Sequence, residues 1–205
     1  MIALDHLAVA GETLEATRAH VEDALGVAMG PGGEHALMGT WNRLLSLGPE
    51  IYLEAITVNP DAPDPGRARW FDLDRFRGAP RLANWIARTD DLAAAMRAAP
   101  PGMGEPVRLT RGVYDWTIAV PEDGILPFDG AAPALIEWHG EAHPAAALAD
   151  VGCRLLRLEI AHPRAMELMR AFPALLQVPL LRLGPGPVCE MRAEIMTPHG
   201  LRYLR

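Results

Sequence analysis

The sequence predicts an α+β protein built from two paired βαβββ modules with a C-terminal βαββ extension. Three observations predict it. A strand, a helix and further strands follow one another twice, the two halves can be aligned, and a shorter third copy begins near Gly152. We expect the first module at residues 1–60, a connector at 61–80, the second module at 81–144, and at 145–205 an extension that completes the same domain.

The first module opens with alternating apolar residues, which predict a strand, and continues with an apolar stripe at helical spacing. Thr13 is placed to cap this helix, and Gly26 to end it. Gly48 and Pro49 form a turn between two apolar runs, which predicts a hairpin. The strands expected in this module are Ile2–Ala10, His35–Thr40, Leu44–Leu47 and Ile51–Val58.

Glu54 is the most informative residue because it stands in the middle of an apolar strand. Side chains alternate along a strand, so Tyr52, Glu54 and Ile56 share one face. Burying an unpartnered carboxylate costs several kcal/mol. Glu54 therefore requires a cation, a hydrogen-bond donor or water.

The connector is rich in proline and aspartate, but Trp70, Phe71 and Phe76 predict that it packs against the protein. The strand and helix pattern then returns. The second module is expected to contain a strand at Arg81–Thr89, a helix at Asp90–Ala99 and strands at Val107–Thr110, Tyr114–Val120 and Ala134–Trp138.

Alignment of the two halves pairs residues of similar chemistry. LDHLAVAGETLEA over LANWIARTDDLAA matches His6 with Asn84, and IYLEAI over ALIEWH matches Glu54 with Glu137. Order, lengths and the mid-strand glutamate agree, which indicates an internal repeat.

The extension starts the pattern a third time, and we expect it to cover an open sheet edge. Pro163 is suited to the first turn of its helix. Its strands are expected at Arg154–Ala161, near Leu180–Leu183 and at Val188–Met196.

Composition excludes several functions. The net charge of −7 and the pI near 5.5 argue against a nucleic-acid partner. The chain has no lysine, which excludes Schiff-base chemistry, and its one serine, Ser46, lies in an apolar strand, which argues against a serine hydrolase. Cys153 and Cys189 have no zinc-motif spacing. With no signal-like segment and no apolar run of ~18 residues, we expect a cytoplasmic protein without a membrane partner.

Several motifs resemble one known family. They are LDHLAV, HALMGTWNRLLSLG, IYLEAI, WIARTDDL, LIEW followed by His143-Pro144, LEIAHP and TPHG. Together they resemble bacterial glyoxalase-like domain proteins of the vicinal oxygen chelate superfamily, over nearly the whole chain. The resemblance implies that the first and fourth strands of each module are neighbours and that the two modules pair. It also implies a small-molecule substrate or ligand.

In metal-dependent members of this superfamily, four positions hold a divalent cation. The resemblance implies His6, Glu54 and Glu137 as the ligands here, whereas Asn84 departs from the usual histidine. Zinc, nickel, manganese and iron suit such a nitrogen and oxygen set. Glu54 and Glu137 are the candidate catalytic groups, because either could move a proton on the carbon beside a polarised carbonyl. The pocket-lining candidates are His35, Asn42, Tyr52, Asn84, Trp116 and His139.

The sequence leaves three functions open. The first is a metal-dependent lyase, isomerase or dioxygenase of the glyoxalase-like type. The second is a metal-free protein that sequesters a small hydrophobic or aromatic compound, as resistance-type members do. The third is a protein that offers only an interaction surface. Metal content separates the first two, an absent cavity would favour the third, and a homodimer is the assembly considered.

Overall fold

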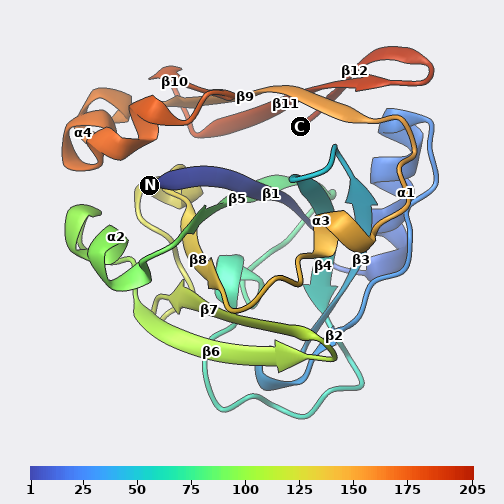
Figure 1. The fold of residues 1–205 in the computed structure, drawn as a ribbon, viewed down its shortest axis with the longest axis horizontal. Helices are drawn as coiled ribbons and strands as arrows, with labels where there is room; N and C mark the ends of the chain where they lie inside the picture. The colour runs from blue at the N-terminus through green and yellow to red at the C-terminus, as the bar shows by residue number, and fades with distance from the viewer.

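Eight strands form one curved sheet in the computed structural model, which describes residues Met1–Arg205 (Figure 1). The strand order is β2-β3-β4-β1-β5-β8-β7-β6, and the sheet bends around a central space. Its strands are β1 (Ile2–Ala10), β2 (Glu34–His35), β3 (Thr40–Ser46), β4 (Tyr52–Val58), β5 (Arg81–Thr89), β6 (Glu105–Arg111), β7 (Tyr114–Val120) and β8 (Ala134–Trp138).

The pairing confirms the expected module architecture. β1 lies parallel to β4, and β5 lies parallel to β8, so the first and fourth strands of each module are neighbours. β1 and β5 pair in antiparallel fashion and join the two modules. The centre of the sheet is therefore made by the four strands expected to carry the site.

The helices begin where the sequence provides a cap. The side chain of Thr13 accepts a hydrogen bond from the N–H of Ala16 at the start of α1 (Leu14–Leu25), and Gly26 ends this helix with φ 72°. The side chain of Asp91 caps α2 (Leu92–Ala98) in the same way. Both helices lie outside the curve of the sheet (Figure 1).

The sheet separates two apolar layers. Leu7, Leu53 and Trp85 belong to the outer layer, which includes residues of α1 and α2. Ile56 and Ile86 belong to the inner layer, on the concave face. Alternation along each strand thus supplies both layers from the same segments.

The C-terminal extension forms a second sheet of four strands, ordered β10-β9-β11-β12. It covers the outer face of the main sheet, not an open edge, because Leu158 and Ile160 share one core with Leu7 (Figure 1). It also has one strand more than expected. Its elements are β9 (Arg154–His162), α4 (Ala165–Ala171), β10 (Leu181–Pro185), β11 (Glu190–Thr197) and β12 (Gly200–Leu204), and the short helix α3 (Pro144–Ala147) precedes them.

Two local predictions are wrong. His35–Thr40 is not a strand, because the chain turns through a 3₁₀ helix at Ala36–Met38 and Gly39 adopts φ 58°. Pro163 does not lie in the first turn of α4, since that helix begins at Ala165 after Arg164.

The connector enters the concave side of the sheet with a short turn at Trp70–Asp72 (blue-green in Figure 1). Phe71 and Asp72 both adopt left-handed backbone conformations, with φ 59° and 55°. For residues with a Cβ this conformation costs roughly 1–2 kcal/mol each. The N–H of Asp72 donates to the carbonyl of Gly124 at 2.9 Å, which holds the turn in place.

Candidate functional site

A β-bulge in β1 begins the candidate site. Leu4 pairs with Ala87 and His6 pairs with Ile86, so Asp5 is an extra residue without a partner on β5. Strict alternation would direct Asp5 and His6 to opposite faces, but a bulge re-aims side chains. In the structure the two side chains meet: Oδ1 of Asp5 lies 2.6 Å from Nδ1 of His6.

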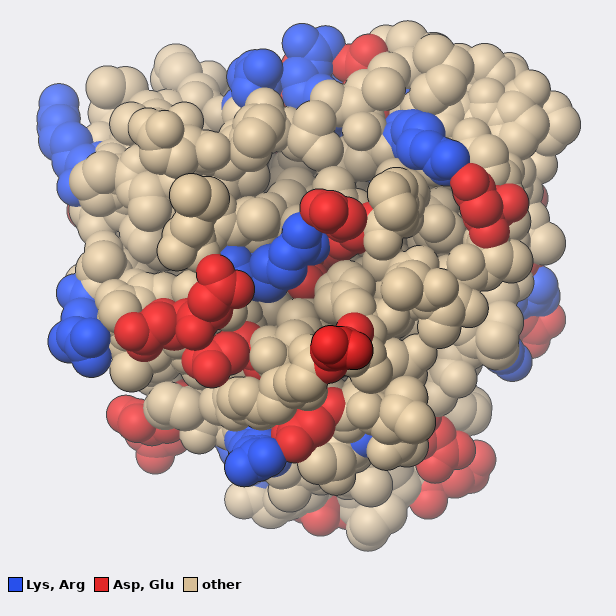
Figure 2. Space-filling model, viewed as in Figure 1, with Lys and Arg blue, Asp and Glu red and all other residues tan.

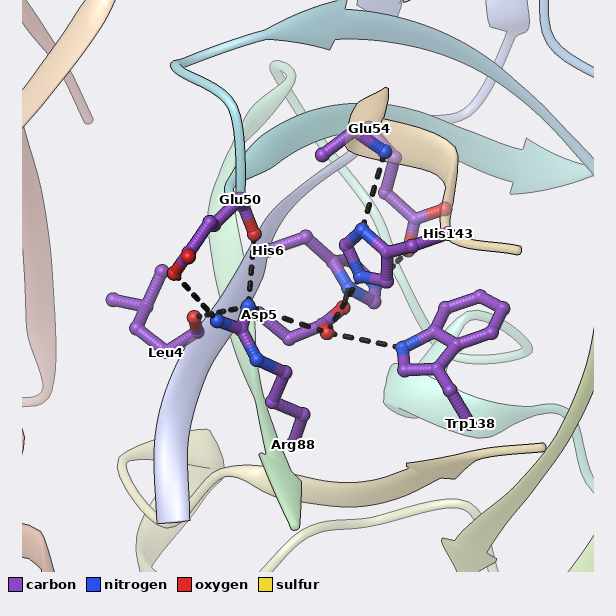
Figure 3. A network of polar contacts seen from close by, with 9 residues as sticks. Leu4, Asp5, His6, Glu50, Glu54, Arg88, Trp138 and His143 are labelled. Atoms are coloured by element: carbon purple, nitrogen blue, oxygen red, sulfur yellow. Dashed lines mark hydrogen bonds and ion pairs between the residues drawn. The ribbon is translucent and has the colours of Figure 1, made fainter. Parts of the chain in front are cut away.

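His6 lies between two carboxylates (Figure 3). Its Nδ1 contacts Asp5, and its Nε2 lies 3.4 Å from Oε1 of Glu54. The other oxygen of Glu54 accepts a hydrogen bond from the side-chain amide of Asn42 at 2.8 Å. The ring of Tyr52 stacks on the imidazole of His6, with centroids 4.3 Å apart. All four side chains are buried.

Asp5 is held by further donors on its second oxygen (Figure 3). Nε1 of Trp138 and Nε2 of His143 each lie 3.0 Å from Oδ2 of Asp5. Nδ1 of His143 accepts from the N–H of Ala145, so His143 carries its proton on Nε2 and donates it to Asp5. Arg88 binds the carboxylate of Glu50 nearby, with its guanidinium 4.0 Å from Asp5. This donor set keeps a fully buried carboxylate ionised.

These contacts determine the charges of the group. Burial alone would lower the pKa of His6, but hydrogen bonds to Asp5 and Glu54, together with their charges, raise it to about 9. Burial would raise the pKa values of Asp5 and Glu54, but their histidine partners hold both below the ordinary range. At neutral pH the site therefore holds an imidazolium between two carboxylates.

His35 has the opposite character. Burial is the main cause that lowers its pKa, to about 4, and the charge of Arg111 acts in the same direction. Arg111 donates to Nε2 of His35 at 3.0 Å, because a guanidinium has no acceptor. Nδ1 of His35 therefore carries the proton and faces the hydroxyl of Thr40 at 3.1 Å. His35 is neutral, while His6 is charged.

The predicted site residues divide between three places. His6, Glu54 and the predicted lining residues His35, Asn42, Tyr52 and Trp116 surround one small cavity of about 30 Å³ on the concave face. That volume holds one or two water molecules. Asn84 lies on the same face but lines a different, larger cleft.

Glu137 and His139 are not where the sequence analysis placed them. Ile136 and Trp138 line the cavity, so Glu137 points to the outer side, where its carboxylate accepts from the N–H of Leu92 at the start of α2. His139 bonds to the hydroxyl of Thr117. The expectation that Glu137 shares a cavity with His6 and Glu54 is therefore wrong. The carboxylate caps a helix instead.

The sequence analysis missed Asp5 and His143 as members of the site. The bulge brings Asp5 into it, and no sequence pattern announces the bulge. His143-Pro144 was noted as part of a motif, and this dipeptide does place the imidazole at the start of α3. Arg111 comes from the end of β6, far from His35 in the sequence, and only the closed curve of the sheet brings them together.

The side chains present do not form the predicted metal site. His6 and Glu54 are two potential ligands, whereas catalytic zinc sites have three protein ligands. Glu137 lies on the other face of the sheet, and Asn84 in the other cleft. No group of three or more histidine, cysteine, aspartate or glutamate side chains is arranged to hold a metal ion.

The surface agrees with a small-molecule partner better than with a nucleic acid. On the face shown in Figure 2, arginine and acidic side chains lie interspersed, with no extended basic patch. None of the helices has the length and apolar character needed to cross a membrane.

Fold and site together define a protein with a curved sheet of paired βαβββ modules and a buried acid–base group on its concave face. A family model described as "Glyoxalase-like domain" matches residues 4–176, and the chain belongs to this family. None of the curated proteins matches the sequence significantly.

Solved structures share the fold. A hypothetical protein from Staphylococcus aureus superposes with a TM-score of 0.63 at 14% identity, covering 93% of this chain and 88% of that one. Methylmalonyl-CoA epimerase from Mycobacterium tuberculosis gives a TM-score of 0.43 at 19% identity over 71% and 91% of the two chains. The Streptomyces coelicolor epimerase with 2-nitronate-propionyl-CoA gives 0.44 at 15% identity over 68% and 97%. At these identities the likeness concerns the fold alone.

Proposed function

We propose that this glyoxalase-like protein is an enzyme that moves a proton on the carbon beside a carbonyl group of a small molecule. The observation that carries the proposal is the charged pair of His6 and Glu54 at one end of a buried chain that begins at Asp5. Perturbed titratable groups in a cavity are typical of functional sites, because holding them buried costs stability.

Glu54 is the base of the proposed reaction. Its carboxylate takes the proton from the carbon, the C–H electron pair passes into the carbonyl group, and the negative charge develops on the carbonyl oxygen. The N–H at Nε2 of His6 donates a hydrogen bond to that oxygen. Return of the proton from Glu54 to carbon completes the cycle, so no oxidant or reductant is needed. Asn42 holds the second oxygen of Glu54 and thus orients the base.

Asp5 is a positioning residue in this scheme. Its carboxylate fixes the imidazole ring and favours the charged form of His6, which is the form with an N–H at Nε2. Trp138 and His143 fix Asp5 in turn. The reacting groups are therefore held in place before substrate arrives, as efficient electrostatic stabilisation requires.

Deuterium exchange tests the proposal. The protein is incubated in D₂O with 1,2-dicarbonyls, α-hydroxyketones and acyl thioesters, and deuterium at the carbon beside the carbonyl is followed by NMR. We expect exchange with at least one class, and a loss of at least 100-fold in Glu54→Gln, in line with the usual contribution of a general base. Glu137→Gln is the matched control and should retain exchange, because Glu137 lies outside the cavity.

Two results would refute proton transfer. One is the absence of Glu54-dependent exchange across the panel, and the other is exchange that persists in Glu54→Gln. Saturable binding without exchange would instead support the metal-free sequestration function.

A divalent metal is the second candidate, favoured by the contact between Asp5 and His6. Metal-bound histidines usually donate their other N–H to a carboxylate or carbonyl. Calorimetric titration with zinc, nickel, manganese and iron tests it on the wild type and Glu54→Gln. Binding tighter than about millimolar, ~4 kcal/mol, that Glu54→Gln weakens would support metal use. Weaker binding by all four would count against it.

A further inference from the structure

The cavity beside His6 and Glu54 is too small for the molecules that the proposed function requires. It measures about 30 Å³, whereas ligand pockets usually enclose ~300–1,000 Å³. A cleft of about 770 Å³ lies between the connector, the start of β5 and the C-terminal sheet. Phe71 is the one residue that lines both spaces. Its ring is therefore the wall between the charged pair and the larger cleft.

The segment that carries this wall is strained. Phe71 and Asp72 both have positive φ, a conformation that non-glycine residues rarely adopt. The indole of Trp70 stacks on Phe71, and its buried Nε1 has no hydrogen-bond partner. Strain and an orphaned donor in one turn mark a segment with more than one arrangement, since such costs cluster at switches and ligand clamps.

The cleft contains an unpartnered polar group. The side chain of Asn84 is 5% exposed and lines the cleft, but its amide makes no hydrogen bond within the protein. A buried amide normally has a partner, because leaving it unpaired costs stability. A ligand in the cleft would supply that partner.

Asn84 occupies the second-module counterpart of His6. A bulge leaves Ala83 unpaired before Asn84, as the bulge at Asp5 does before His6. The two repeats thus aim one polar side chain each at the concave face, from either side of Phe71.

Charge at the cleft favours an anion. Three of its four carboxylates are already engaged, since Asp72 pairs with Arg75, Glu159 with Arg192, and Asp129 with His162; the fourth, Glu190, is not. The guanidinium of Arg81 lies 4.1 Å from the centroid of the Phe76 ring and pairs with no carboxylate. Arg81 is thus available to a ligand, and Phe76 offers an apolar surface beside it.

We propose that this cleft is the outer half of the substrate site, where Asn84 and Arg81 bind the anionic tail of an elongated small molecule while Phe71 moves aside to admit its carbonyl end to His6 and Glu54. The proposal rests on the proton-transfer function for the carbonyl end alone. Tail binding and the movement of Phe71 can be measured without turnover.

Access to His6 tests the wall. Exchange of its Cε1–H for deuterium is followed by mass spectrometry in Phe71→Gly, which removes the ring and relieves the strain. Phe128→Gly is the matched control, because Phe128 has the same left-handed conformation (φ 56°) but lines neither space. We expect at least 10-fold faster exchange in the first variant and less than 2-fold change in the second. Phe71→Asn, which also tolerates this backbone, serves if Phe71→Gly does not fold.

Binding of 8-anilinonaphthalene-1-sulfonate, an anion with aromatic rings, tests the tail site. We expect saturable binding of one molecule to the folded protein, weakened at least 5-fold by Asn84→Ala and by Arg81→Gln. Arg170→Gln, an exposed arginine on α4 outside the cleft, is the control and should leave the affinity unchanged.

Each result has a clear reading. Equal exchange rates in the Phe71 and Phe128 variants would overturn the wall, and unchanged affinity in both cleft variants would overturn the tail site. Loss of Glu54-dependent proton exchange alone would refute the proposed function and leave both of these measurements standing.

Discussion

Replacement of Asp5 by asparagine should lower the pKa of His6. The interval between the ordinary value of 6.5 and about 9 corresponds to about 3 kcal/mol in favour of the charged imidazole, after the cost of burial is met. Asp5 is the nearer carboxylate, at 2.6 Å against 3.4 Å for Glu54. Removing its charge leaves Glu54 alone to oppose burial. We expect the pKa of His6 to fall by at least one pH unit, about 1.4 kcal/mol.

The assay is an NMR pH titration of protein labelled in its histidine side chains, with His6→Gln used to assign the signal. His143 is a useful internal reference, because it also contacts Asp5 but lies nearer the surface. A pKa of His6 within about 0.5 of the wild-type value in Asp5→Asn would refute the reasoning. The charge of His6 would then have to come from Glu54.

Three further predictions follow from the same contacts. Stability should peak near pH 6.5: His6, with its raised pKa, loses its contribution as pH climbs toward 9, whereas His35, with its lowered pKa, loses its contribution as pH falls toward 4, each by about 3 kcal/mol at most; urea unfolding across pH should show both flanks, His6→Gln should flatten only the alkaline one, and a flat profile would contradict this. Trp138→Phe removes one donor to buried Asp5 and should cost about 1.5–3 kcal/mol in the same measurement. Gly124→Ala should lower the melting temperature by several degrees, because its Cβ would lie 2.1 Å from the carbonyl oxygen of Arg69 at φ 77°; an unchanged melting temperature would mean that the connector turn can shift.

The fold was predictable because its signals are local and repeated. Thr13 and Gly26 bound α1, and the turn at Gly48 sets the hairpin of β3 and β4. The β5 limits, Arg81–Thr89, also follow from alternation alone. Each of these features depends on residues within one short stretch of chain.

The site was predictable only in part, because it depends on departures from regularity. Alternation correctly placed Tyr52 and Glu54 on the concave face. The same rule could not place Asp5, since a bulge breaks the period at that residue. Glu137 shows the limit of the repeat argument: it aligns with Glu54 in sequence, yet β8 presents Ile136 and Trp138 to the cavity instead.

The paired bulges at Asp5 and Ala83 give the molecule two equivalent seats with different occupants. In one seat an acidic residue stands before a histidine, and in the other an alanine stands before an asparagine. A duplicated scaffold has thus divided its labour: one copy keeps the ionisable pair, and the other keeps the geometry with a neutral side chain. Ala83→Asp with Asn84→His would restore symmetry to the two seats without altering the backbone plan. The pair of substitutions would ask of one chain whether its second half has lost a chemistry or acquired a separate task.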